Sequence, residues 1–185
     1  MKRALWSLAA LAAFLSFAPS AAAQPADGLR LGIRVGAYFP ADEDVRDAFG
    51  EVLPLVGLAL ANPARPGTFA VFPNLEISGA RSGSDRFLVI PLTAVGEYQF
   101  PGDPRGIVPF VRGEAGVAYY DYRVRLDSAR VVRARRGGPA GAAEVGLRVT
   151  PYFRASARYR LFREYDDVDF SGLELNFVIG SLRLY

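Results

Sequence analysis

Polar and apolar side chains alternate along several stretches of this chain, and residues 152–162 show the pattern most clearly. In that segment, YFRASARYRLF, one parity carries Arg154, Ser156, Arg158 and Arg160. The other parity carries Phe153, Ala155, Ala157, Tyr159 and Leu161. Because successive side chains of a β-strand point to opposite faces of a sheet, this segment is predicted to be a strand with one ionic face and one apolar face.

Gly- and Pro-rich breaks divide the chain into eight stretches of this kind. The breaks include ANPARPG, PGDPRG, Thr150-Pro151 and a hairpin tip at Asp127-Ser128. The predicted strands are 29–39, 52–60, 68–79, 87–100, 107–126, 131–149, 152–162 and 172–185. Strand 52–60 is the least regular of them, since Pro54 interrupts it. Every connection except the first is short, which favours an antiparallel meander.

The first connection, PADEDVRDAFG, has the signals of one short helix. Asp42 is a suitable N-cap, the two acidic residues after it suit the first turn, and Gly50 suits the C-terminal end. Val45, Ala48 and Phe49 then share one face. We therefore predict a helix of about two turns between the first two strands.

Residues 1–23 have the features of a secretory signal peptide. Lys2 and Arg3 form a charged start, an apolar run follows at 4–17, and Ala21-Ala22-Ala23 is a small-x-small cleavage site before Gln24. A retained membrane helix is the alternative, because residues 4–23 nearly suffice to span a bilayer. The short apolar core favours cleavage. Losing the two initial charges lowers the formal net charge from +3 to +1, so nucleic acid is not an expected partner.

Two missing residue types restrict the chemistry of the chain. It has no cysteine, which excludes disulfides and thiolate metal sites, and no histidine, which removes the commonest general base and metal ligand. We therefore predict no catalytic residue, no metal site and no cofactor. Ser156 lies among arginines without a base, so it is not expected to be a nucleophile. The DDVD segment at 166–169 lacks the spacing of an EF-hand calcium loop.

The alternation does not by itself show which face of the sheet is enclosed. A soluble lipocalin-like barrel would turn the apolar parity inward and bind an apolar ligand, whereas a membrane barrel would turn it toward lipid. The polar parity mixes glycines with charges of both signs, which suits the narrow interior of an eight-stranded barrel. Its charged members are Arg30, Arg34, Glu76, Glu97, Arg112, Glu114, Glu144, Arg148, Arg154, Arg158, Arg160 and Glu174. We favour the membrane barrel, with these residues as a paired charge network in the lumen.

Aromatic residues of the apolar parity favour the same orientation. Phe39 and Tyr119 mark one end of the strands, and Phe100, Phe153 and Tyr185 mark the other. Membrane barrels place aromatic girdles at these two levels. The predicted fold is therefore all-β: an eight-stranded antiparallel up-and-down transmembrane β-barrel over residues 24–185, with one short helix in its first extracellular loop.

With its signal peptide, its eight alternating strands and its ending FVIGSLRLY, the chain resembles the small outer-membrane β-barrels of Gram-negative bacteria, of the OmpA transmembrane-domain and OmpX-like type. In that family the last strand carries an assembly signal of a glycine and a terminal aromatic residue. Gly180 and Tyr185 match this signal, whereas Arg183 stands where a hydrophobic residue is usual. The resemblance implies an outer-membrane location, insertion by the barrel-assembly machinery and outer-membrane lipid around a protein that we expect to be monomeric.

Parity and the resemblance also assign the connections to the two sides of the membrane. Residues 40–51, RSGSD, the tip at Asp127 and residues 163–170 would be extracellular, and ANPARPG, PGDPRG and Thr150-Pro151 would be periplasmic. The long strands at 107–126 and 131–149 would project outward, and their protruding part carries Arg123, Arg125, Arg130, Arg133, Arg135 and Arg136. These arginines are candidates for binding lipopolysaccharide phosphates. Pairing with the acidic loops at 42–47 and 164–169 is the alternative.

Three functional hypotheses remain. The first is a non-enzymatic envelope protein with a filled lumen and with loops that contact surface polyanions. The second is a narrow, porin-like pore whose arginines favour anions, although eight strands and pairing glutamates argue against an open channel. The third is an outer-membrane enzyme. The resembling barrels that modify lipid A, and the barrel proteases, rely on histidine, so the sequence favours the first hypothesis.

Overall fold

The computed structural model describes residues 30–61, 66–103, 106–125, 130–150 and 152–183. The elements in these residues are β1 (Arg30–Pro40), α2 (Glu43–Phe49), β2 (Leu53–Ala61), β3 (Phe69–Leu75), β4 (Ser78–Ser82), β5 (Asp85–Gln99), β6 (Val108–Arg125), β7 (Val131–Thr150), β8 (Phe153–Phe162) and β9 (Gly172–Arg183). The predicted signal peptide lies outside the described residues. Within the described residues, no helix combines the length and the apolar character needed to cross a membrane.

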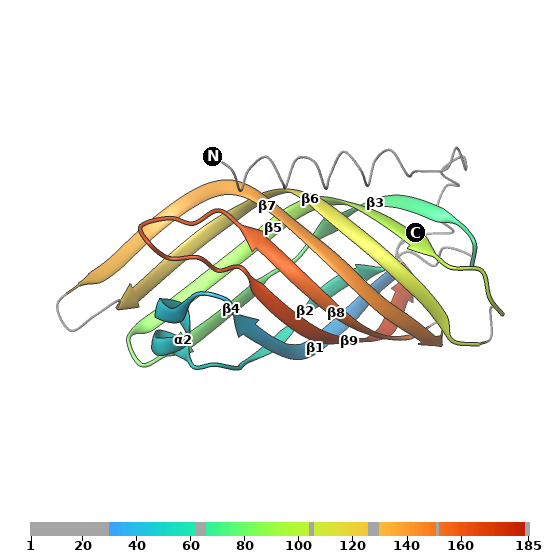
Figure 1. Ribbon diagram of the computed structural model, residues 1–185, viewed down its shortest axis with the longest axis horizontal. Helices are drawn as coiled ribbons and strands as arrows, with labels where there is room; N and C mark the ends of the chain where they lie inside the picture. Colours follow the sequence, from blue (N-terminus) through green and yellow to red (C-terminus); the bar gives the residue numbers. More distant parts are fainter. Residues whose placement is uncertain (1–29, 62–65, 104–105, 126–129, 151, 184–185) are drawn as a thin grey trace.

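The strands form one antiparallel sheet that curls into a barrel (Figure 1). Hydrogen-bonded neighbours follow the order β2-β1-β9-β8-β7-β6-β5-β3, and β4 also pairs with β5. Since β1 pairs with β9, the first and last strands of the chain are neighbours. The predicted all-β, up-and-down arrangement is confirmed.

The two ends of this strand order meet without forming a ladder. Among the described residues, no backbone pairing joins β2 to β3 or to β4. The edges nevertheless approach one another, because a Cβ atom built on Gly57 of β2 would lie 3.2 Å from the carbonyl oxygen of Ile77. We call this line between β2 and β3–β4 the seam.

β3 and β4 take the place of the single strand predicted at 68–79. Both pair with β5 in one continuous register. The interruption at Glu76 and Ile77 lies opposite Pro91, which has no backbone N–H to donate to the ladder. Glu76 donates its own N–H to the carbonyl oxygen of Pro91 at 3.2 Å. The two segments are thus one interrupted strand of the wall, which keeps the predicted number of eight.

The predicted helix is confirmed as α2. The Asp42 side chain accepts a hydrogen bond from the Val45 N–H at 3.0 Å, as an N-cap residue does. Gly50 ends the helix with φ of 104°, a left-handed conformation that favours glycine. Val45 is fully buried, and Phe49 packs edge-to-face on Phe87 of β5 with ring centroids 5.2 Å apart. These contacts hold the helix on one end of the barrel.

That end of the barrel, which we call the loop end, gathers four of the connections. α2, the β4–β5 turn, the β6–β7 hairpin and the β8–β9 loop lie together at the left of Figure 1. They are the connections predicted to be extracellular. β6 and β7 are the longest strands and extend beyond the others at this end.

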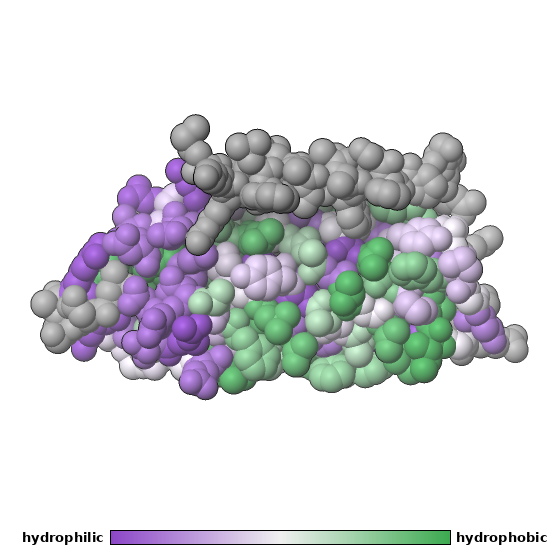
Figure 2. All heavy atoms as spheres, in the orientation of Figure 1, coloured by the Kyte–Doolittle hydropathy of each residue, from purple (hydrophilic) through white to green (hydrophobic). Residues whose placement is uncertain are grey.

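The polarity of the barrel is the reverse of that of a soluble protein. Six arginines and five glutamates of the inner face are buried. The outer face carries exposed apolar side chains, among them Val56 at 71% and Val145 at 58% exposure. Figure 2 shows hydrophobic residues along the wall and hydrophilic residues at the loop end. The arrangement is the reverse of the lipocalin-like alternative, and it suits an apolar solvent around the barrel.

If lipid surrounds the wall, an outward-facing arginine will be costly in the middle of the wall and tolerated near the loop end. Leu175→Arg lies between Ala37 and Ala157, and it should lower the free energy of unfolding by about 2–4 kcal/mol. Leu88→Arg lies opposite Asp121 near the loop end, and it should cost about 0–1 kcal/mol.

The measurement is urea unfolding of protein refolded in liposomes, followed by circular dichroism because the only tryptophan, Trp6, belongs to the predicted signal peptide. Equal losses for the two variants would contradict a lipid-facing wall.

Candidate functional site

A row of inward-facing residues alternates in charge across five neighbouring strands. In the strand registers each of these residues lies directly opposite the next. They are Glu97 of β5, Arg112 of β6, Glu144 of β7, Arg158 of β8 and Glu174 of β9. We call these five residues the alternating ladder. Each of them is at most 4% exposed. Directly opposed residues on one face have Cβ atoms about 4.5–5.5 Å apart, so every neighbour in the ladder is an opposite charge.

Glu76 is the carboxylate with the most ion pairs. Its Oε2 atom lies 2.8 Å from Nη1 of Arg34 and 2.7 Å from Nη1 of Arg158. Its Oε1 atom accepts from Nη2 of Arg160. Arg34 comes from β1 and the other two arginines from β8, so one carboxylate connects three segments of the wall across the lumen. Charge-assisted pairs of this kind replace the water that buried ions lose.

Glu114 forms a second centre beside it. Its Oε2 atom lies 2.7 Å from Nη2 of Arg158 and also accepts from Thr93 at 3.0 Å and Asn74 at 3.3 Å. Its Oε1 atom lies 3.1 Å from Nε of Arg112. Buried carboxylates are stable when several donors satisfy them, and this one accepts hydrogen bonds from residues of β3, β5 and β8.

Glu97 organises the end of the lumen that is opposite the loop end. Nη1 of Arg154 lies 2.8 Å from its Oε2, and Gln99 donates to its Oε1 at 2.7 Å. The Arg154 guanidinium also lies over the Phe110 ring, 5.2 Å from the centroid. Arg148 is buried opposite Arg154. The structure thus brings together every predicted lumen residue except Arg30, whose side chain is outside the described residues.

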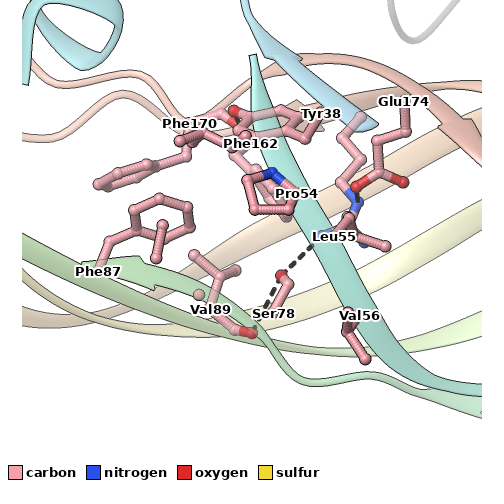
Figure 3. Close-up of a pocket in the computed structure, with 14 residues that line it drawn as sticks. Tyr38, Pro54, Leu55, Val56, Ser78, Phe87, Val89, Phe162, Phe170 and Glu174 are labelled. Carbon is pink, nitrogen blue, oxygen red and sulfur yellow. Dashed lines mark hydrogen bonds and ion pairs between the residues drawn. The ribbon is translucent and has the colours of Figure 1, made fainter. Parts of the chain in front are cut away.

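The seam is bridged by these side chains. Arg34 belongs to β1, the strand paired with β2, whereas Glu76 and Ser78 belong to the other edge. Arg160 donates to the Ser78 hydroxyl at 2.9 Å, and that hydroxyl contacts the Val89 carbonyl oxygen at 3.5 Å (Figure 3). Ion pairs and hydrogen bonds of side chains therefore link the β3–β4 edge to β1 and β8, beyond an edge strand, β2, that no backbone ladder joins to β3 or β4 in the described residues.

A narrow pocket lies at the seam, on the side of the loop end (Figure 3). Its apolar wall includes Leu55, Phe87, Val89 and Phe170, and Arg160 and Glu174 lie at its polar side. The lining is largely aliphatic and aromatic, so the pocket continues the apolar packing of this end of the barrel.

An apolar cap closes the lumen above the ion pairs, and the alternation of the sequence did not predict it. Its buried members are Tyr38, Val45, Leu53, Leu55, Phe87, Val89, Ala118, Tyr120, Tyr122, Val124, Ala140, Val168 and Phe170. The Tyr38 hydroxyl donates to the Phe170 carbonyl oxygen at 2.6 Å. The available signal was the inward parity of β6, which changes from charged residues in mid-strand to Tyr120, Tyr122 and Val124 at the loop end.

The β8–β9 loop folds onto the β6–β7 hairpin. Tyr165 and Val168 exchange backbone hydrogen bonds around Asp166 and Asp167, which both have positive φ and form the turn between them. The Tyr122 hydroxyl donates to the Asp166 carboxylate at 3.0 Å. Burial, followed by this carboxylate, raises the pKa of the Tyr122 phenol above its usual value, so it remains a protonated donor at neutral pH.

The six arginines predicted on the hairpin divide into two groups. Three of them have carboxylate partners: Arg130 with Asp167 at 2.9 Å, Arg135 with Asp121 at 3.2 Å, and Arg136 with Asp166 at 3.9 Å. The other three, Arg123, Arg125 and Arg133, are exposed and have no carboxylate partner among the described residues.

Gly180, predicted as part of an assembly signal, has a conformational role. It has φ of 89° and lies where the register between β1 and β9 shifts, as in a β-bulge. Its N–H donates to the Tyr152 carbonyl oxygen at 3.0 Å. A side chain would be strained at this position. Tyr185, the other predicted member of the signal, lies outside the described residues.

The described residues contain no group of three or more acidic, histidine or cysteine side chains arranged to hold a metal ion. Ser156 lies on β8 opposite Gly146 and Asn176, neither of which is a base.

No family model matches the chain, and no curated protein matches it by sequence. It is similar to solved structures, including Ail, the attachment invasion locus protein of Yersinia pestis, at 11% identity and a TM-score of 0.52, over 82% of this chain and 95% of Ail. A structure of Ail in complex with the heparin analogue sucrose octasulfate matches at 12% identity and a TM-score of 0.51, over 82% of this chain and 96% of that one. Neisserial surface protein A matches at 12% identity and a TM-score of 0.51, over 85% of this chain and 99% of that protein.

At these identities the likeness concerns the fold. This chain has the fold of the small eight-stranded outer-membrane β-barrels, as the resemblance predicted. Proteins of one fold differ widely in function, so the fold alone assigns none to this chain.

Glu76→Gln will test the central ion pairs, because it removes the charge and keeps the shape of the side chain. It leaves three buried guanidinium groups without their shared counter-charge and should lower the free energy of unfolding by about 3–5 kcal/mol. Glu164→Gln, on an exposed loop residue, is the matched control and should stay within about 0.5 kcal/mol of the unchanged protein.

Denaturant unfolding in liposomes measures both variants. Adding Arg160→Gln to Glu76→Gln should cost less than Arg160→Gln alone, since the two residues interact directly. A loss for Glu76→Gln no larger than that of Glu164→Gln would show that the pairs are not needed for stability.

Proposed function

We propose that this chain is a non-enzymatic β-barrel protein of a bacterial outer membrane. Residues 1–23 are its cleaved signal peptide, and residues 24–185 insert as a monomer through the barrel-assembly machinery. The observation that carries the proposal is the reversed polarity: buried Arg–Glu pairs inside and exposed Leu, Ile and Val side chains outside. Only an apolar solvent makes that distribution favourable.

The lumen of this protein is a filled interior. The alternating ladder and the ion pairs of Glu76 and Glu114 occupy its middle, and the apolar cap closes it at the loop end. Conduction requires a continuous path for water and ions. Because paired charges fill the middle of the lumen and packed aromatic rings fill its loop end, we expect no such path. The role of the barrel in the membrane is then structural.

Its surface function belongs to the loop end, where arginine side chains are exposed. The hairpin residues Arg123, Arg125 and Arg133 are candidates for contacts with polyanions of the cell surface, because guanidinium groups bind phosphate and sulfate oxygens. The Ail structure with sucrose octasulfate shows a polyanion with another barrel of this fold.

Fractionation of a Gram-negative host that expresses the full chain tests the location. The protein should pellet with outer membranes, resist carbonate extraction and migrate differently on gels before and after boiling, with an N-terminus at residue 24. A variant that lacks residues 1–23 is the control and should not reach the outer membrane. Recovery of the full chain in the soluble periplasmic fraction would refute the proposal.

Conductance in a planar bilayer tests the filled lumen. The purified barrel should give no discrete openings, whereas a general porin in the same membrane gives them. Anion-selective openings that Arg154→Gln with Arg158→Gln abolishes would instead establish the narrow pore.

A further inference from the structure

Four arginines lie side by side on the outer face of the wall near the loop end. The registers place Arg81 of β4 opposite Arg86 of β5, Arg86 opposite Arg123 of β6, and Arg123 opposite Arg133 of β7. All four are exposed. We call them the arginine row. Two of them, Arg81 and Arg86, lie outside the hairpin that the sequence indicated.

The arginine row is electrostatically unfavourable for the isolated protein. Like charges directly opposite each other on a sheet repel, and the Cα atoms of neighbouring residues in the row are about 5 Å apart. Asp121 is the nearest carboxylate that pairs with the row, 4.0 Å from Arg86, and it is also paired with Arg135. Arg81, Arg123 and Arg133 have no carboxylate partner among the described residues.

The inner face of the same sheet shows how the chain treats charges that must be compensated by the protein itself. There the alternating ladder opposes each of its arginines with a glutamate, and Arg154, which lies opposite Arg148, has Glu97 as its partner. The arginine row opposes arginine with arginine over four strands. This difference indicates that the counter-charges of the row come from outside the protein.

The height of Arg123, within the row, fits the headgroup layer of a membrane. On the outer face of β6, Tyr119 is the last exposed apolar residue before the charged end. Arg123 is four residues further, about 13 Å along the strand and about 10 Å along the membrane normal for a strand tilted by 35–45°. The headgroup layer is about 5–8 Å thick on each side. An arginine side chain is long enough to bring its guanidinium back into that layer.

Acidic residues at the loop end also disfavour the approach of soluble polyanions to this row. α2 and the β8–β9 loop carry acidic residues, and two of these, Asp166 and Asp167, already neutralise Arg136 and Arg130. A large soluble anion that approached the loops would meet these carboxylates. The arginine row faces sideways from β4–β7 and is reached from the plane of the membrane.

We propose that the arginine row binds phosphate groups of lipids in the leaflet at the loop end, with lipopolysaccharide as the phosphate-rich lipid of that leaflet. Guanidinium groups bind phosphate oxygens through paired hydrogen bonds, and adjacent arginines share the charge of one or two phosphates. The inference rests on the proposed membrane location, and it extends the polyanion site from Arg123 and Arg133 of the hairpin to Arg86 and Arg81 on the wall of the barrel.

The test uses the mature protein in phosphatidylcholine nanodiscs that contain either bisphosphorylated lipid A or lipid A without phosphates. Lipid retained after purification is quantified by mass spectrometry. The unchanged protein should retain the phosphorylated form selectively. Arg86→Gln with Arg123→Gln should weaken that retention roughly 25-fold, from about fivefold for each arginine near an anionic surface.

Arg130→Gln with Arg136→Gln is the matched control, because it removes the same charge from the neighbouring hairpin. It should leave retention within about twofold, since these arginines are paired with Asp167 and Asp166. Equal losses in the two double variants, or retention that does not depend on phosphate, would overturn the proposal. Should the row variant fail to insert, Arg133→Gln alone should still weaken retention about fivefold.

Two further readouts separate the alternatives. Titration with sucrose octasulfate shows whether the row takes a soluble polyanion: binding that the row variant loses, with lipid A retention unchanged, would replace the lipid proposal. The gel shift on boiling monitors the barrel itself. Failure of the unchanged protein to enter nanodiscs would refute the proposed membrane function, whereas inserted protein without lipid selectivity would refute only the arginine row as a lipid site.

Discussion

Three guanidinium groups from two strands meet at the carboxylate of Glu76, and much of the architecture depends on enclosed charges of this kind being matched. A barrel in lipid must turn its polar residues inward, where ions are stable only with opposite charges and hydrogen bonds around them. The alternation of sign between neighbouring strands supplies the opposite charges. With the charges matched inside, the outer wall is free to be almost entirely apolar.

The sequence predicted the elements and the direction of their side chains because both depend on local signals. The period of two in residues 152–162 and the cap residues Asp42 and Gly50 required no knowledge of the neighbours. The break within the third predicted strand was beyond such signals. Its cause is Pro91, a residue of the following strand, and only the register shows that the two lie opposite each other.

The candidate sites were predictable to the same extent. Parity assigned Arg158 and Glu174 to one enclosed face, but their pairing is a property of the register. The same holds for Arg86, which the sequence alone gave no reason to group with Arg123. The apolar cap was missed because Tyr120 and Tyr122 share the parity of the charged residues. A change from charged to aromatic residues along one face of a strand can be interpreted only when the registers of the neighbouring strands are known.

The seam has a consequence for the mechanics of the wall. A closed ladder fixes the circumference of a barrel, because every strand is held to both neighbours by backbone hydrogen bonds. Here β2 is held in that way to β1 only, within the described residues. Arg34 of β1 and Arg160 of β8 reach Glu76 and Ser78 on the other side of the seam, and side chains can change rotamer without breaking a ladder. The circumference of this barrel can therefore change at the seam. Backbone amide hydrogens beside the seam should exchange with solvent first.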